Sequence, residues 1–172
     1  LKNRRTIRNF DPEFAISKEQ LKEIVNALQI SPTGRNLQGV DYIVITNKDK
    51  IKEISKVAYD AFPKEVKAGF DARRSKYAVK DPIACDATTV ILAVKNERAG
   101  NYAGIDTGIG IMSAIVAAQE FKIDSMCLGC IVSPKVEELL GLKEGSLVIG
   151  LALGKVKGKP ILDRKEIKTA VT

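Results

Sequence analysis

Apolar residues at helical spacing mark the first regular element of the chain. Over residues 18–30 the apolar positions lie three or four apart, which predicts an amphipathic helix with one buried face. The apolar positions are Leu21, Ile24, Val25 and Leu28. Ser17 and Gln20 form the capping-box pattern that begins helices. Because Pro32 disfavours helical backbone at the residue before it, we expect the helix to end near Ser31.

Three more helices are predicted downstream. Residues 49–59 place their apolar side chains on one face. Ser133 and Pro134 supply an N-cap and a first-turn proline for a short helix that ends at Gly141. The longest helical pattern covers residues 102–121 and is apolar nearly all round, which indicates a long, buried central helix.

Strands are predicted where β-branched and apolar residues run together. They cover residues 41–46, 88–94, 126–132 and 146–153. Residues 60–81 are weakly patterned, and their Lys and Arg side chains are too dense to bury, so we predict a lid or a mobile helix there. Strands and helices alternate without a regular βαβ repeat. The pattern therefore predicts one α+β sandwich over residues 1–172.

Length and composition are those of an ordinary soluble domain. The chain has 172 residues, of which 45% are hydrophobic and 28% charged, so one sizeable core is expected. Its longest nearly apolar run, residues 109–118, is far shorter than the ~20 residues that span a bilayer. No basic-then-apolar leader is present, although the chain begins at Leu1 rather than Met, which leaves open a longer native N-terminus. We expect a cytoplasmic protein without a membrane partner.

Histidine and cysteine usage limits the chemistry. The chain has no histidine, which excludes every catalytic triad and metal site that needs imidazole, so an enzyme with this sequence would rely on a cofactor. Its cysteines, Cys85, Cys127 and Cys130, are too few and odd in number for a disulfide framework, as in a reducing compartment. Cys127 and Cys130 form a Cys-x-x-Cys pattern within a predicted strand. We interpret them as two small buried residues, with a redox pair as the alternative.

Positive charge gathers at the two ends of the chain. The net charge is +7, and residues 1–10 hold four basic residues without an acid. Residues 155–168 hold six basic residues against two acids, so the rest of the chain is close to neutral. Basic ends that meet in space would form a compact anion site, whereas separate ends would be solvated tails. Aromatic residues make up only 5%, which does not favour a nucleic-acid surface.

Two polar segments carry candidate binding groups. Residues 4–8 (RRTIR) place three guanidinium groups and one hydroxyl close together, and guanidinium groups bind phosphate oxygens in bidentate geometry. Residues 31–38 (SPTGRNLQ) lie between a predicted helix and a predicted strand. The amides of Asn36 and Gln38 suit the edge of a heteroaromatic ring, and Gly34 allows close backbone approach. A plain helix stop and turn is the alternative for this segment.

The order and spacing of these segments resemble the nitroreductase family of flavin enzymes over nearly the whole chain. Further matching motifs are Asp106-Thr107-Gly108, Cys127-Leu128-Gly129 and Ala152-Leu153-Gly154. The resemblance implies a nitroreductase-like three-layer α-β-α sandwich with a mixed, mainly antiparallel central sheet. It also implies a homodimer with FMN at the subunit interface, NAD(P)H as a transient electron donor and a small-molecule acceptor such as a nitroaromatic or a quinone.

The resemblance assigns the cofactor to residues from two subunits, with no catalytic side chain beside the flavin and no metal. One subunit would supply Arg4, Arg5, Thr6 and Arg8, with Arg164 and Lys165 adding charge at the phosphate. The partner would supply Pro32, Thr33, Gly34, Asn36 and Gln38. Met126, Cys127, Leu128 and Gly129 would line one face of the flavin through backbone and side chains.

Departures from the family pattern all remove aromatic walls. Gly39 and Val40 stand where the family has Pro-Trp, Cys127 replaces a strand Trp, and Lys155 replaces a Tyr. The acceptor is therefore not carried over, and a flavin-binding or redox-sensing protein with little turnover is the alternative to an enzyme. A basic nucleic-acid module is a third reading. Gly108 and Gly110 approach a dinucleotide fingerprint, but no strand precedes them, so we interpret them as close helix packing.

Overall fold

A four-stranded antiparallel sheet forms the centre of the protein. The computed structural model describes residues 4–159, and its sheet has the strand order β1-β2-β4-β3. The strands are β1 (Val40–Ile45), β2 (Thr89–Lys95), β3 (Asp124–Leu128) and β4 (Leu147–Gly154). Every named pair is antiparallel, and a single parallel bridge joins Thr6 to Ser125 at the β3 edge. The sheet is thus mainly antiparallel with one parallel addition, as predicted.

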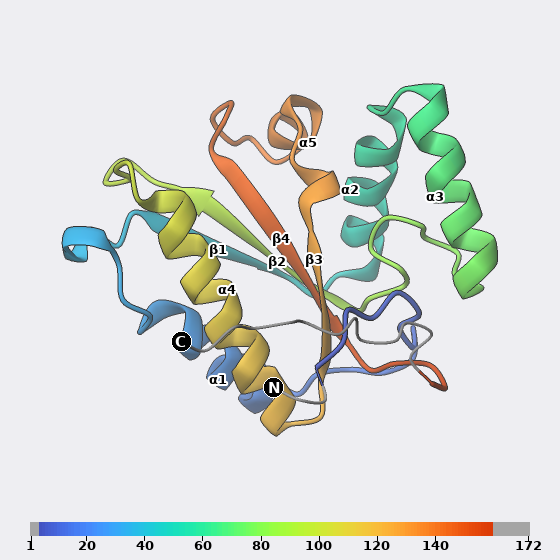
Figure 1. Ribbon diagram of the computed structural model, residues 1–172, viewed down its shortest axis with the longest axis horizontal. Helices are drawn as coiled ribbons and strands as arrows, with labels where there is room; N and C mark the ends of the chain where they lie inside the picture. Colours follow the sequence, from blue (N-terminus) through green and yellow to red (C-terminus); the bar gives the residue numbers. More distant parts are fainter. Residues whose placement is uncertain (1–3, 160–172) are drawn as a thin grey trace, which may run out of the picture.

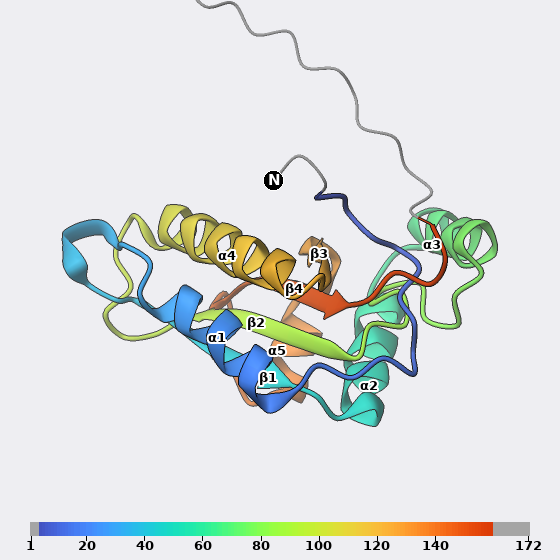
Figure 2. The same ribbon diagram turned by 90° about the horizontal axis from the view of Figure 1, so that it is seen from below.

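Helices cover both faces of the sheet and complete a three-layer sandwich (Figure 1). The helices are α1 (Lys18–Gln29), α2 (Lys48–Asp60), α3 (Lys64–Tyr77), α4 (Ala103–Glu120) and α5 (Pro134–Leu139). Figure 2 shows α1 and α4 side by side on one face, with α2 on the other. Two hydrophobic clusters follow from this arrangement: Ile24, Ile111 and Leu151 belong to the α1–α4 side, and Ile54 and Leu92 to the α2 side.

The predicted caps are present where the sequence placed them. Ser17 Oγ accepts the Gln20 N–H at 3.2 Å, and Gln20 Oε1 accepts the Ser17 N–H at 3.1 Å, which completes the capping box of α1. Ser133 Oγ accepts the Val136 N–H at 3.3 Å at the start of α5. Gly141, with φ +64°, lies just beyond the end of α5.

The strand predicted over residues 126–132 is wrong in its second half. The structure has β3 at Asp124–Leu128, followed by a 3₁₀ turn at Gly129–Ile131. The ladder ends where Leu128 pairs with Gly150, and the Ile131 side chain then packs against Gly150, where any larger residue would collide with it. Ile131 therefore fills the core from a turn, so its apolar character reflects burial rather than strand pairing, whereas Val132 is exposed.

The charged segment 60–81 is mostly helical, as one of its two predicted alternatives required. It forms the regular helix α3, whose buried Phe70 packs against the rings of Phe62 and Tyr59. Its cations contribute to packing: the Arg73 guanidinium lies 4.9 Å from the centroid of Phe70, and Lys67 lies over Tyr59. Long basic side chains can cover apolar surface while their charged ends stay in water, so dense charge did not prevent docking.

Helix α4 is as long as predicted, but only one of its faces is buried in the single chain. Residues such as Ile111, Ala114 and Ala118 pack into the core at 4% exposure or less. On the opposite side, apolar side chains are exposed to solvent. These are Ile105 at 63%, Ile109 at 40%, Met112 at 39% and Val116 at 40%. Gly110 packs closely as expected, since a Cβ there would lie 2.5 Å from Tyr42 Oη. Close packing is wrong for Gly108, which is exposed and where a Cβ would meet no atom within 4 Å.

Candidate functional site

The basic N-terminal segment lies along the outer edge of β3. The Ile7 N–H donates to Ser125 O at 3.1 Å, and the Ile7 side chain is buried. Because side chains alternate along extended backbone, Thr6 and Arg8 lie on the other side of the segment, where both are half-buried. Arg4 and Arg5 are also half-buried. The segment therefore presents guanidinium and hydroxyl donors next to β3.

Strand β3 presents an open strip beside these donors. Met126 and Leu128 are buried in the core at 3% and 1% exposure, so only their backbone could touch a ligand, contrary to the predicted side-chain contact. Cys127 is exposed and Cys130 half-buried, so the interpretation of Cys127 as a buried residue is wrong. A Cβ at Gly129 would meet no atom within 4 Å. Burial raises the pKa of the Cys127 thiol, and the Arg4 charge opposes that rise.

The two basic ends of the chain run side by side. Phe10 and Val156 form an antiparallel bridge, and the Lys157 N–H donates to Asn9 O at 2.7 Å. Asn9 Nδ2 donates to Lys157 O at 2.8 Å as well. The ends therefore converge as far as Lys159. Arg164 and Lys165, the remaining predicted phosphate residues, lie outside the described residues.

This donor set fits an anionic, planar cofactor. Guanidinium groups suit phosphate oxygens, a threonine hydroxyl suits a polyol chain, and the open strip at Cys127 and Gly129 leaves room for a flat ring. Within residues 4–159, no group of three His, Cys, Asp or Glu side chains could hold a metal ion. None of the helices in this part of the chain is long and apolar enough to cross a bilayer.

The predicted polar loop, residues 31–38, is ordered by specific contacts. The Gly34 N–H donates to Asp106 Oδ1 at 2.9 Å, and the Gln38 N–H donates to Thr33 Oγ1 at 3.0 Å. Asn96 Nδ2 donates to Gln38 O at 3.1 Å. These contacts go beyond a simple helix stop and turn.

Backbone strain is concentrated in the same loop. Arg35, Asn36 and Gln38 have φ of 56°, 54° and 48°, in the left-handed region that side chains other than glycine seldom adopt. Each such residue costs on the order of 1–3 kcal/mol and persists only where its surroundings enforce it. Pro32, Asn36 and Gln38 are exposed, so the strained loop presents its amides outward.

One chain does not bring its two predicted half-sites together. The loop is attached to α4 at Asp106, whereas the N-terminal segment pairs with Ser125, beyond the other end of α4. At 1.5 Å per residue, the helix between Asp106 and Glu120 spans about 21 Å. Figures 1 and 2 both place the loop at one end of the molecule and the N-terminal segment elsewhere. The two predicted half-sites therefore lie apart within a single chain.

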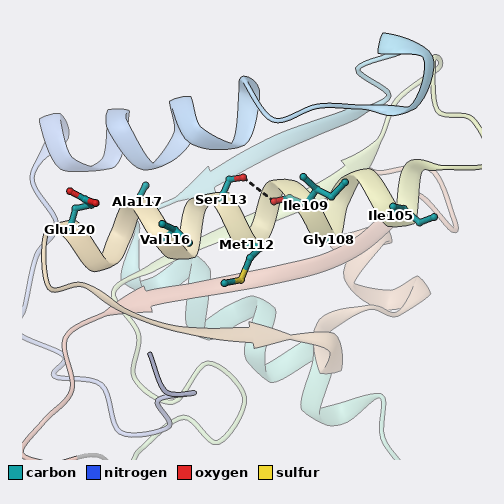
Figure 3. Close-up of a pocket in the computed structure, with 8 residues that line it drawn as sticks. All are labelled: Ile105, Gly108, Ile109, Met112, Ser113, Val116, Ala117 and Glu120. Atoms are coloured by element: carbon teal, nitrogen blue, oxygen red, sulfur yellow. Dashed lines mark hydrogen bonds between the residues drawn. The ribbon is translucent and has the colours of Figure 1, made fainter. Parts of the chain in front are cut away.

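The exposed face of α4 forms an open apolar groove of about 850 Å³. Figure 3 shows that the lining side chains come from the length of this one helix, including Ile105, Met112 and Val116. Ser113 lies at its border, where its hydroxyl donates to Ile109 O and accepts from Ser31 Oγ at 2.9 Å. A contiguous apolar surface of this kind marks an interaction site on a soluble protein.

Sequence reasoning missed the residues that hold the loop. Asp106 and Asn96 bond its backbone, and Tyr102 packs directly against Gly34. Asp106 lies in the Asp106-Thr107-Gly108 motif. The sequence distinguishes it only as an acidic residue in an otherwise apolar helical pattern. The contact joins residues 72 positions apart, so spacing along the chain could not reveal it.

Comparisons with known proteins identify a family and several similar structures. The family model described as "Nitroreductase family" matches residues 1–155. A Bacillus subtilis (strain 168) protein described as FMN reductase (NAD(P)H) is 27% identical over 182 aligned positions, covering 97% of this chain and 70% of the relative. The solved structure of a nitroreductase with bound FMN from Bacteroides fragilis NCTC 9343 has a TM-score of 0.77 at 21% identity, covering 99% of this chain and 96% of that one. A second, from Desulfitobacterium hafniense DCB-2, has a TM-score of 0.76 at 21% identity, covering 98% and 94%. The chain has the predicted fold, and the family model matches most of the chain's length. The chain therefore belongs to the nitroreductase family.

Proposed function

We propose that this protein is an FMN-dependent oxidoreductase that uses NAD(P)H to reduce a small acceptor such as a nitroaromatic or a quinone. FMN, when bound, would supply the redox chemistry in two half-reactions, one with the nicotinamide and one with the acceptor. The observation that carries the proposal is the pair of complementary half-sites at opposite ends of α4. Family membership and the FMN-bound relatives support the choice of cofactor.

The working unit in this proposal is a homodimer. The apolar stripe of α4 is exposed in one chain, and burying it against a second copy would remove that surface from water. A two-fold axis uses the same patch on both subunits, so each loop can reach the N-terminal segment of the other chain. The geometry thus accounts for both the exposed helix face and the divided site.

Each half-site has its own role. Arg4, Arg5, Thr6 and Arg8 bind the phosphate, the ribityl chain and the ring edge from one subunit, with Arg164 and Lys165 adding positive charge. The partner contributes Pro32, Thr33, Gly34, Asn36 and Gln38, whose amides orient the ring. Backbone of Met126 and Leu128, together with Cys127 and Gly129, forms the floor beneath the ring. The chain needs no histidine for this work, because its donors only position and stabilise charge.

The first test is an absorbance spectrum of the purified protein, supplemented with FMN, before and after anaerobic addition of NADH or NADPH. We expect visible flavin bands that bleach on reduction and return when a quinone or a nitroaromatic is added. A protein that takes up no FMN would overturn the proposal. A protein that binds nucleic acid in a salt-sensitive manner without flavin would support the nucleic-acid reading instead.

Arg8 offers a direct test of the phosphate and ring site. Arg8→Ala removes a half-buried guanidinium beside β3, and we expect the FMN dissociation constant to rise at least tenfold, since a charge-assisted hydrogen bond contributes about 1.5–3 kcal/mol. Lys52→Ala is the matched control, because Lys52 is an exposed cation on α2 that pairs with the neighbouring Asp49. Equal FMN affinity in both variants would contradict the assignment of Arg8.

One observation favours a second candidate, a flavin-binding protein with slow turnover. A Cβ at Gly39 would lie 2.6 Å from Ala99 Cα, so this position has no room for the larger residue of the family pattern. Cys127 is likewise small and exposed where the pattern has an aromatic ring. The substrate side of the site is therefore reshaped. Bound flavin that NAD(P)H reduces only very slowly would favour this candidate.

Cytoplasmic residence remains a prediction from the cysteine usage.

A further inference from the structure

Asp106 is a buried carboxylate whose position the proposed reaction does not explain. It lies in the first turn of α4 with 7% of its surface exposed. Its Oδ1 accepts the Gly34 N–H at 2.9 Å, across 72 residues of sequence. A buried carboxylate is costly unless it is hydrogen-bonded, and an acidic group is favoured at a helix N-terminus. The carboxylate is thus placed to hold Gly34.

Residue 34 can approach this carboxylate because glycine has no side chain. A Cβ at residue 34 would lie 2.9 Å from both Cβ and Cδ2 of Tyr102, so only glycine allows the loop backbone to rest on the Tyr102 ring. Tyr102 is the N-cap residue of α4, and its carbonyl accepts the Asp106 N–H at 2.8 Å. The first turn of α4 therefore both supports Gly34 and supplies its hydrogen-bond acceptor.

The loop is held by a small number of specific contacts rather than by a packed core. A polar hollow of about 510 Å³ lies under the loop, with Thr33, Gln38, Tyr42 and Asp106 among its lining residues. Water can fill a polar space of this size, so packing alone does not fix the loop. The loop nevertheless keeps Arg35, Asn36 and Gln38 in left-handed backbone conformations, which requires definite restraints. The bond from Gly34 to Asp106 is such a restraint, immediately before the first strained residue.

We propose that Asp106 is a positioning residue that holds loop residues 33–38 in the strained conformation in which they contact the partner subunit's cofactor. The inference rests on the proposed function, since it takes the loop to be the partner's half of the FMN site. It adds that the affinity of that site is set by a carboxylate that touches neither the cofactor nor the substrate. Preorganisation of the loop lowers the entropic cost of binding.

The test compares three variants of the full-length protein. Asp106→Ala removes the acceptor. Asp106→Asn keeps an amide oxygen at the same place and should restore the bond to Gly34. Glu97→Ala is the matched control, because it removes an exposed carboxylate from the segment between β2 and α4. Amide hydrogen exchange read by mass spectrometry follows the peptide that spans residues 31–39, first without FMN.

We expect exchange in this peptide to speed up at least tenfold in Asp106→Ala and to match wild type in Asp106→Asn and Glu97→Ala. With FMN added, the dissociation constant should rise about tenfold in Asp106→Ala alone, while kcat at saturating FMN stays within about twofold. A helix that had only lost stability would show faster exchange across the whole of α4, and that result would overturn the proposal.

Further outcomes separate this inference from the proposed function. Unchanged loop exchange in Asp106→Ala overturns the inference even if FMN binds well. A wild-type protein that binds no FMN overturns the proposed function, and faster loop exchange in Asp106→Ala then still supports the holding role of Asp106. Should Asp106→Ala not fold, the wild-type Gly34 amide decides by NMR: slow exchange relative to Arg35 supports the bond, and equally fast exchange overturns it.

Discussion

Gly110 and Tyr42 form a tight contact between α4 and β1 that can be measured by a double-mutant cycle. A Cβ at residue 110 would lie 2.5 Å from Tyr42 Oη, about 1 Å inside ordinary van der Waals distance. The next atoms, Tyr42 Cζ at 3.5 Å and Leu28 Cδ2 at 3.7 Å, are at normal contact distance. The phenolic oxygen alone therefore makes the position too small for alanine.

Two opposing effects set the magnitude for Gly110→Ala. Alanine is favoured over glycine inside a helix by about 1 kcal/mol. Overpacking of a well-filled site costs about 1–3 kcal/mol. We expect Gly110→Ala to lower the free energy of unfolding by about 1 kcal/mol in the wild-type background. In a Tyr42→Phe background the colliding oxygen is gone, so the same change should raise it by up to about 1 kcal/mol.

The assay is urea denaturation of the four proteins at one protein concentration, with the coupling energy taken from the cycle. We expect a coupling of about 2 kcal/mol. Gly69→Ala is the control, because Gly69 lies inside α3 where a Cβ would meet no atom within 4 Å, and it should stabilise in both backgrounds. If Gly110→Ala stabilises equally with Tyr42 and with Phe at residue 42, the tyrosine moves aside freely and the argument is refuted.

Two other predictions concern the surface of α4 and the buried thiol. Ile109→Asp places a charge in the exposed apolar stripe of α4, and we expect it to yield monomers that retain little FMN, as measured by sedimentation velocity and absorbance, whereas Val66→Asp, at a similarly exposed position on α3, should remain dimeric. Burial raises the pKa of the Cys85 thiol to about 12 from 9.0, so the native thiol keeps its proton above pH 9 while the unfolded one loses it. Stability should thus fall by about 1.4 kcal/mol more in wild type than in Cys85→Ala between about pH 8 and about pH 10, and equal losses in urea titrations would contradict the assigned burial.

Local signals in the sequence predicted most of the elements correctly. The capping box at Ser17 and Gln20 and the Ser133 cap are formed within a few residues, so spacing alone reveals them. The end of β3 could not be found in this way, because it depends on where Gly150 lies in a neighbouring strand. Likewise, Lys67 of α3 lies over the Tyr59 ring of α2, a use of a cation that hydrophobic patterning does not register.

The sequence shows the residue types of the candidate site but not their positions relative to one another in the folded chain. By residue type the N-terminal donors and the loop amides are candidate binding groups, and the family resemblance assigns both to one cofactor. Their separation along α4 is a property of the folded chain, since the loop meets the helix at Asp106 and the N-terminal segment meets β3 at Ser125. The inward side chains of Met126 and Leu128 follow from the strand's register, which sequence alone left open.

The length of α4 between the two half-sites has a genetic consequence in the proposed dimer. A chain defective at Arg8 and a chain defective at Asn36 are each inactive as homodimers, because every site then contains one damaged half. In a mixed dimer the two lesions fall in the same site, and the other site is assembled from two undamaged halves. Two nonfunctional alleles should therefore complement one another when expressed together, whereas two alleles damaged in the same half should not.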